Sequence, residues 1–191
     1  MKEKFEILPS LPAYGEMYVT IPENAYTKYS EGLAVKFIRN DNSEWVGNFE
    51  KGNSNLKFAS KLKNNDNVLV IAFGICYIVN IENIKPIMEF GFDYKEVFEF
   101  KDSFVLIGEY SISVVESLEK IKHFDNLCYD GISNVELEDG KINGILNDYD
   151  SSANNIEIPF TLNLETLEFI ENGIVKRQNQ TESKKWWKIW K

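Results

Sequence analysis

Apolar and β-branched residues recur along most of the chain with the short period typical of β-strands. Residues 33–38 and 44–49 form two such runs, and the polar segment 40–43 between them has the composition of a turn. This pattern predicts a β-hairpin. Residues 97–100 and 104–107 predict a second hairpin in the same way.

A third hairpin is indicated by residues 135–137 and 141–146, which are joined by a turn that contains Asp139 and Gly140. An Asp-Gly pair between alternating strands is a strong hairpin signal, because Gly adopts positive φ angles without steric cost. Helical periodicity is weak throughout the sequence. The apolar pattern therefore predicts an all-β protein.

The chain contains an internal repeat with an offset of 34–35 residues. Residues 69–74 and 104–108 are apolar runs that end in Gly, and each is followed by a second apolar run and by a third that ends in Phe. A further predicted strand precedes each set. Each repeat thus predicts a unit of four short antiparallel strands, over residues 57–90 in one case and 96–124 in the other.

A looser third unit follows between residues 135 and 170, with a polar insertion at 147–155, and the hairpin at 33–49 belongs to a further unit. We expect the Pro- and aromatic-rich segment 8–29 to run along the body as an extended segment that completes or covers the assembly. One unit alone cannot bury both of its faces, so the units must lie side by side. The fold prediction is an all-β serial array of four-stranded antiparallel units, propeller-like whether or not it closes, with a two-sheet β-sandwich as the alternative.

The composition changes sharply after residue 175. Residues 176–191 hold six basic residues and one acidic residue, a net charge of +5, together with three of the four Trp residues. The other 175 residues carry a net charge of −14, which leaves −9 for the chain. We predict one β domain over residues 1–175 and a basic, Trp-rich tail over 176–191. The tail could dock on the acidic body, lie on an anionic membrane surface or bind a protein partner.

The charge and the N-terminal residues limit the classes of function. An acidic body repels phosphate backbones, so we expect no nucleic-acid binding. Residues 1–6 mix acids with bases and no apolar segment follows them, which is not typical of a signal peptide. The two Cys residues cannot form a disulfide framework. We therefore expect a cytoplasmic protein, with attachment to a membrane through the tail as a less favoured alternative.

No motif typical of an enzyme occurs in the sequence. Nucleophile-elbow, phosphate-loop, dinucleotide-binding and zinc-protease patterns are missing, and the single His, His123, has no partner at a catalytic spacing. Residues 148–154 alternate oxygen-bearing side chains as a calcium loop does, but Ala153 and Pro159 stand where such a loop needs Gly and Glu. We expect no enzyme activity, no metal and no cofactor. A hydrolase with carboxylates in a central cleft is the alternative.

Three stretches of the sequence resemble other proteins. They are residues 11–18 (LPAYGEMY), 29–37 (YSEGLAVKF) and 44–49 (EWVGNF). They resemble a set of small bacterial cytoplasmic proteins that share an LPxYGxMY…YSEGxxVxF…WVxNF pattern and a YDG-like turn, which is here at residues 129–131. This set has no established activity, so the resemblance implies no catalytic residue. Its members are similar to immunity proteins of bacterial toxin systems.

These observations lead to the hypothesis of a non-enzymatic protein-binding module of the bacterial cytoplasm. Its most specific form is an immunity protein that neutralises a basic toxin, because an acidic surface raises the rate of association with a basic partner. Aromatic residues are enriched at binding hot spots. The candidate contact residues are Tyr14, Met17, Tyr18, Tyr29, Trp45, Tyr129, Asp130, Trp186, Trp187 and Trp190. Ordinary core packing is the alternative role for the aromatic residues among them.

Overall fold

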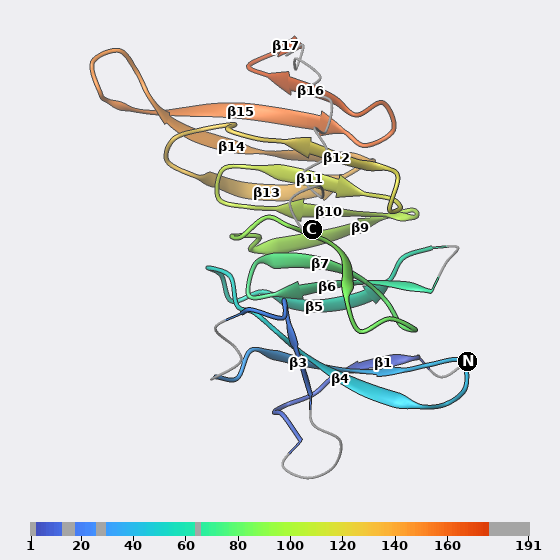
Figure 1. Cartoon of the computed structure of the whole chain (residues 1–191). Coiled ribbons are helices and arrows are strands. Elements are labelled where there is room, and N and C mark those ends of the chain that lie inside the picture. The colour runs from blue at the N-terminus through green and yellow to red at the C-terminus, as the bar shows by residue number, and fades with distance from the viewer. Residues whose placement is uncertain (1–2, 13–17, 26–29, 64–65, 176–191) are drawn as a thin grey trace.

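The computed structural model describes residues 3–12, 18–25, 30–63 and 66–175, and the regular structure in these ranges consists entirely of β-strands. The strands form four sheets, named A to D here in chain order, which lie one above another (Figure 1). The prediction of an all-β serial array is therefore confirmed. The array has four layers and does not close into a barrel, whereas the alternative prediction of a sandwich required two layers.

Sheets B and C are the two predicted repeats. Sheet B consists of β5 (Lys57–Lys61), β6 (Asn67–Ala72), β7 (Ile75–Asn80) and β8 (Pro86–Phe90). Sheet C consists of β9 (Glu96–Phe100), β10 (Ser103–Ile107), β11 (Ile112–Val115) and β12 (Ile121–Phe124). Each strand pairs antiparallel with the next one along the chain, because the connections are too short for any other pairing.

Sheet A contains the predicted hairpin of β3 (Leu33–Ile38) and β4 (Glu44–Phe49). Two short strands complete it: β1 (Phe5–Ile7) pairs antiparallel with β3, and β2 (Val19–Ile21) pairs parallel with β4. Part of segment 8–29, which is expected to complete or cover the assembly, therefore completes sheet A as β2, and residues 5–7 add β1 at the other edge. Their backbone groups bind both edges of the hairpin, which would otherwise be unpaired.

Sheet D consists of β13 (Ile132–Glu138), β14 (Lys141–Tyr149), β15 (Asn155–Asn163), β16 (Glu168–Glu171) and β17 (Ile174–Val175). Its first turn has positive φ at both Asp139 (47°) and Gly140 (73°), as the predicted Asp-Gly hairpin requires. The polar insertion expected at 147–155 is shorter than predicted. Strands β14 and β15 stay paired as far as Tyr149 and Asn155, so the turn spans only 150–154.

Alternation along the inner strands explains the stacking. On β6, Val68 and Val70 face sheet A, while Leu69 and Ile71 face sheet C, and all four side chains are buried. A strand buried on both faces has a continuous apolar sequence, which is what made sheets B and C visible as apolar runs. Three apolar layers result, one between each pair of successive sheets.

The connections between strands gather at two opposite ends of the stack. At one end, polar groups in the turns of successive sheets bind each other, through the backbone N–H in the case of Asn40, and we call this the clasped end. The pairs are Asn40–Glu82 between sheets A and B, Lys63–Asp102 between B and C, and Lys101–Glu165 between C and D. The other end is described below, because it carries the candidate site.

Candidate protein-binding surface

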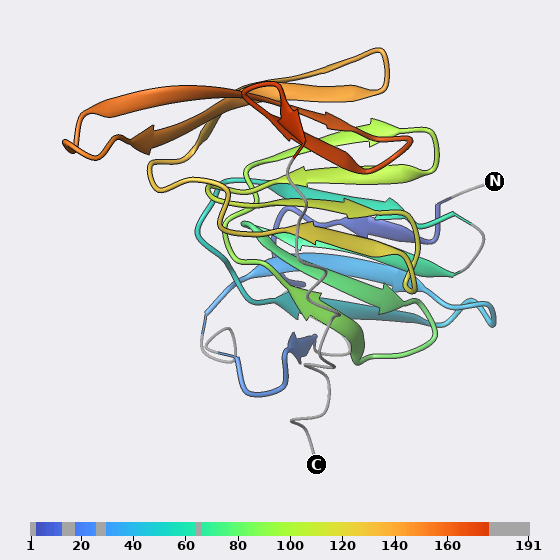
Figure 2. The ribbon, with the colours of Figure 1, turned by 90° about the horizontal axis from the view of Figure 1, so that it is seen from above.

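The second end of the stack is formed by residues 91–95, 108–111, 125–131 and 148–154, and we call it the acidic end. These four connections hold six carboxylates and one lysine. The carboxylates are Asp93, Glu109, Asp125, Asp130, Asp148 and Asp150. Because the connections belong to sheets B, C and D, residues far apart in the sequence form one surface (Figures 1 and 2).

Exposed aromatic side chains gather on the same surface. Within the described residues, four aromatic side chains are exposed: Phe92 (57%), Tyr110 (45%), Tyr129 (81%) and Tyr149 (45%). Each comes from a different connection or strand terminus of the acidic end. Large exposed aromatic side chains are unusual when they occur together, and Tyr is among the residue types enriched at protein interfaces.

The backbone of this end is held by hydrogen bonds between sheets. Asn53 N–H donates to the carbonyl of Phe92 at 2.8 Å, and Tyr94 N–H donates to the carbonyl of Gly74 at 3.2 Å. The Ser54 hydroxyl donates to the Tyr94 carbonyl at 2.6 Å. Sheet B is thereby joined to the entrance of sheet C, so the connections have defined positions and are not free loops.

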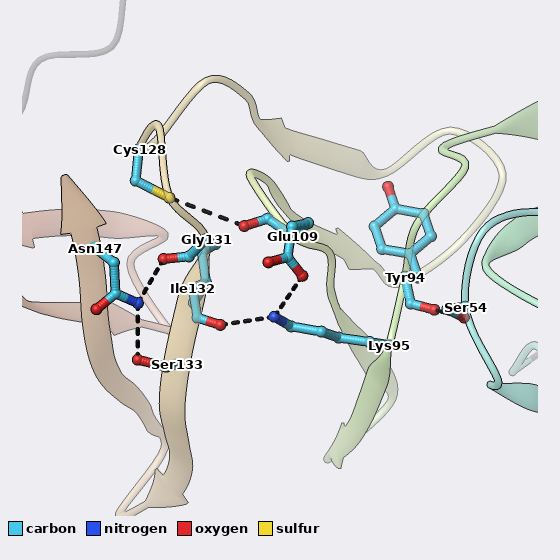
Figure 3. A network of polar contacts seen from close by, with 9 residues as sticks. All are labelled: Ser54, Tyr94, Lys95, Glu109, Cys128, Gly131, Ile132, Ser133 and Asn147. Atoms are coloured by element: carbon cyan, nitrogen blue, oxygen red, sulfur yellow. Dashed lines mark hydrogen bonds and ion pairs between the residues drawn. The ribbon is translucent and has the colours of Figure 1, made fainter.

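A lysine joins sheets C and D (Figure 3). Lys95 Nζ lies 2.8 Å from Glu109 Oε2 and donates to the Ile132 carbonyl at 2.8 Å. Beside it, the Asn147 side-chain amide donates to the Gly131 carbonyl at 2.9 Å and contacts the Ser133 hydroxyl at the same distance. The Lys95 charge is therefore directed into the contact between two sheets and away from a ligand at the surface.

The acidic end also contains an open hollow of about 750 Å³ between sheets B and C. Its lining combines polar, acidic and apolar groups, which come from the segment before β5, the β8–β9 connection and the β10–β11 turn. The lining residues are Asn53, Ser54, Asn55, Leu56, Asp93, Lys95, Glu109 and Tyr110.

The electrostatics around the tyrosines reflect the excess of carboxylates. The pKa of the Tyr149 phenol is raised above its usual value of 10.0, first of all by the negative charge of Asp130 and to a smaller degree by Asp148. A side-chain hydrogen bond between the Tyr149 phenol and Asp130 contributes to the same rise, so the hydroxyl already has a partner within the fold while the side chain stays 45% exposed.

The structure places the predicted contact residues in different parts of the fold. Tyr129 and Asp130 are exposed on the acidic end. Trp45 instead lies in the core between sheets A and B at 7% exposure, where its ring stacks on Phe37 with a centroid distance of 4.4 Å. Its indole N–H donates to the Ile81 carbonyl at 2.9 Å, so both its apolar ring and its polar atom are occupied within the fold. Trp45 is therefore not available to a partner.

Other predicted contact residues are not on the acidic end. Tyr18 is half-buried beside β2 of sheet A. Tyr14, Met17, Tyr29, Trp186, Trp187 and Trp190 lie outside the described residues.

Phe92, Tyr110 and Tyr149 are exposed aromatic residues that are not among the predicted contact residues. Tyr110 lies two residues after Gly108 in the repeat and Phe92 directly follows Gly91, so an aromatic residue shortly after such a Gly is a signal for these two, but Tyr149 has no such signal. That signal does not show that the connections meet at one end. Their proximity becomes visible only when the sheets are stacked.

The single histidine belongs to a buried polar chain and not to a catalytic set. Ser113 Oγ lies 2.8 Å from His123 Nδ1 and 2.5 Å from Tyr94 Oη, and Ser113 is fully buried. Burial lowers the pKa of His123 below its usual 6.5. A serine without solvent access cannot attack a substrate, so the arrangement orders the core between sheets B and C.

The remaining candidate chemistry is structural in the same sense. Asp150 accepts hydrogen bonds from the backbone N–H groups of Ser152 (2.8 Å) and Asn154 (2.9 Å), as in a stabilised turn. Cys76 is fully buried and Cys128 nearly so, and both thiols are free. Across the residues that the structure describes, no group of three or more His, Cys, Asp or Glu side chains could hold a metal ion.

Comparison with known proteins adds no assignment. No protein-family model matches the chain, and no curated protein matches its sequence. In the part of the chain with described coordinates, no helix has the length and apolar character needed to cross a membrane.

Proposed function

We propose that the protein is a non-enzymatic protein-binding module, and that the acidic end is its binding surface. The observation that supports this most directly is the position of Phe92, Tyr110, Tyr129 and Tyr149, the aromatic residues that are exposed in the described part of the chain. All four lie at one end of the stack, on connections held by hydrogen bonds between sheets. A fixed aromatic surface loses little conformational entropy when a partner binds.

The surrounding charge indicates the kind of partner. Six carboxylates accompany the tyrosines, and the one lysine of these connections is bound to Glu109. A basic partner would be attracted to this surface over a Debye length of about 10 Å, and its cations could pack on the tyrosine rings. Toxin neutralisation in the bacterial cytoplasm is the most specific form of the proposal, because the resemblance to immunity proteins and the acidic charge both favour it.

Affinity capture with matched variants tests the proposal. Tagged full-length protein is used as bait in a lysate of the native host, the captured basic protein is purified, and its affinity is measured by titration calorimetry. Replacing Tyr129 and Tyr149 together with Ala should weaken binding about 10-fold or more, since truncated hot-spot residues cost about 2 kcal/mol or more. Raising the salt concentration should slow association.

Ile84→Ala is the matched control. Ile84 is 42% exposed, close to the 45% of Tyr149, but it lies in the β7–β8 connection at the clasped end. Its replacement should leave binding within about twofold. Equal loss of affinity in both variants, or no basic protein captured by the wild-type bait, would overturn the proposal.

A further inference from the structure

The hollow between sheets B and C contains a carboxylate that the fold does not use. Asp93 is half-buried and lines the hollow, yet it makes no hydrogen bond or ion pair with any described residue. Its Oδ1 lies 2.8 Å from the position that a Cβ on Gly108 would occupy, which places the carboxylate directly against the β10–β11 turn. A partly buried carboxylate favours a cationic partner, because burial makes its own hydration incomplete.

The lysine in the same lining does not cancel this preference. Lys95 Nζ is bound to Glu109 Oε2 and to the Ile132 carbonyl, both at 2.8 Å, and so points toward sheet D (Figure 3). Lys95 and Glu109 neutralise each other, and Asp93 leaves the lining with one net negative charge. Among the described residues of the lining, no cation is free to bind an anionic ligand, whereas the Asp93 carboxylate is free to bind a cationic one.

The rest of the lining favours a guanidinium over an ammonium. Tyr110 stands at the hollow with 45% of its surface exposed, and the half-buried Leu56 supplies apolar surface. Arginine is planar, stacks on aromatic rings and binds carboxylates with two parallel hydrogen bonds, while lysine is a compact, strongly hydrated charge. The side-chain amides of Asn53 and Asn55 add acceptors in the same lining.

The hollow is also rigid. Gly74 has φ +104°, and a Cβ added there would lie 2.7 Å from the Phe92 carbonyl oxygen and 3.1 Å from Asp93 Cα. This close approach, with the Ser54–Tyr94 hydrogen bond of 2.6 Å, fixes Asp93 relative to sheet B. A backbone held in this way limits the entropy that the Asp93 segment loses when a side chain binds.

From these observations we infer that the hollow at the acidic end is a pocket for an arginine side chain presented by the protein partner. The inference rests on the proposed function and deepens it, because it assigns the partner an exposed arginine. Asp93 binds the guanidinium, and the Tyr110 ring packs against it.

The pocket can be tested without knowing the partner. N-acetyl-arginine methylamide is titrated into ¹⁵N-labelled full-length protein at low salt, and amide shifts are followed by NMR. Saturable shifts should centre on residues 53–56, 93 and 110, and the neutral citrulline analogue should not produce them. Asp93→Asn should abolish saturation, since a hydrogen bond to a charged group corresponds to about 10-fold or more in affinity.

Two controls make the result specific. Asp139→Asn removes the same charge in a turn at the clasped end, where the φ of 47° suits Asn, and should leave the titration unchanged. Arg177→Gln removes the arginine of residues 176–191. Arginine shifts that appear only in this variant would assign the hollow to the chain's own arginine and overturn the assignment to a partner.

The outcome is separable from that of the proposed function. Arginine shifts lost in Asp93→Asn but kept in the Tyr129/Tyr149 double variant support the pocket, whatever the capture experiment yields. Absent shifts, equal shifts with citrulline, or unchanged shifts in Asp93→Asn overturn the pocket. If Asp93→Asn also leaves the affinity for a captured partner unchanged, the aromatic surface stands without the pocket.

Discussion

The two ends of the stack use their charged residues in different ways. At the clasped end, the Asn40 N–H donates to Glu82 Oε1 at 2.7 Å, and Lys101 Nζ lies 2.5 Å from Glu165 Oε1. At the acidic end, Lys95 is bound within the fold, while Asp93 has no ion-pair partner among the described residues. Charged side chains of the clasped end are therefore used in contacts between sheets, whereas the Asp93 carboxylate of the acidic end is left available for another molecule.

The two ends also differ in the kind of side chain that they expose. Ile84 and Leu167 are exposed at the clasped end, but they are aliphatic and lie near side chains that are already paired. Four exposed side chains of the acidic end are aromatic, namely those of Phe92, Tyr110, Tyr129 and Tyr149, and carboxylates lie in the same connections. Isolated exposed aliphatic residues are normal on any protein surface, so the aromatic cluster is the more informative of the two.

The largest predicted effect comes from Gly74, in the β6–β7 turn that contacts the acidic end. Gly74→Ala places a Cβ 2.7 Å from the Phe92 carbonyl oxygen at φ +104°, so we expect a loss of about 3 kcal/mol or more in the free energy of unfolding. Gly173→Ala is the matched control, because it also has positive φ (76°) but nothing within 4 Å. It should cost only about 1 kcal/mol. Urea unfolding measures both, and equal losses would show that the close approach at Gly74 is unimportant.

A smaller difference in the free energy of unfolding is expected between variants of Lys95, at the acidic end, and of Lys101, at the clasped end. Lys95→Met removes a half-buried contact that joins sheets C and D and leaves the Ile132 carbonyl without its donor, so we expect a loss of about 1–2 kcal/mol. Lys101→Met removes a pair whose side chains are 63% and 64% exposed, and should change stability by no more than about 0.5 kcal/mol. Urea unfolding at low and high salt provides the measurement. A larger loss for Lys101 would reverse the comparison.

The inner sheets could be predicted from the sequence because both of their faces are buried. Residues 69–74 and 104–108 are nearly continuous apolar runs, and the turns between strands are short and polar. The outer sheet A was only half predicted. Strand β1 has just three residues with Glu6 in the middle, and β2 pairs parallel with β4, which lies far along the chain, so neither has a local signal.

In the candidate site too, only residues with a local sequence signal could be predicted. Tyr129 and Asp130 could be selected because the resemblance includes a YDG-like turn at residues 129–131, and Tyr129 is indeed exposed. Trp45 was selected as an exposed contact, but it shares a strand face with Phe49 and lies opposite Phe37, both in the core. The strand period of two could have placed it inside. The meeting of Phe92, Tyr110 and Tyr149 depends on how the sheets stack, which short-range patterns do not contain.

The smallest predicted effect is a dependence on pH that arises near the acidic end. Burial lowers the pKa of His123, so below its usual value of 6.5 the unfolded chain takes up a proton that the folded protein resists. His123 therefore contributes stability that is fully present above about pH 6.5 and is lost as the pH falls below it. At the clasped end, the hydrogen bond from Lys101 lowers the pKa of Glu165 from 4.5, so that pair loses stability only at lower pH.

Unfolding in urea at pH 7.5 and 5.5 isolates this contribution, because the sequence contains one His. Lowering the pH from 7.5 to 5.5 should destabilise the wild-type protein more than His123→Gln, which cannot titrate but can still form a hydrogen bond with Ser113. The pKa of Glu89 is raised, mainly by burial, which adds a slope of opposite sign in both proteins and cancels when the two are compared. Identical pH slopes for wild type and variant would show that His123 is equally easy to protonate in the folded and unfolded chain.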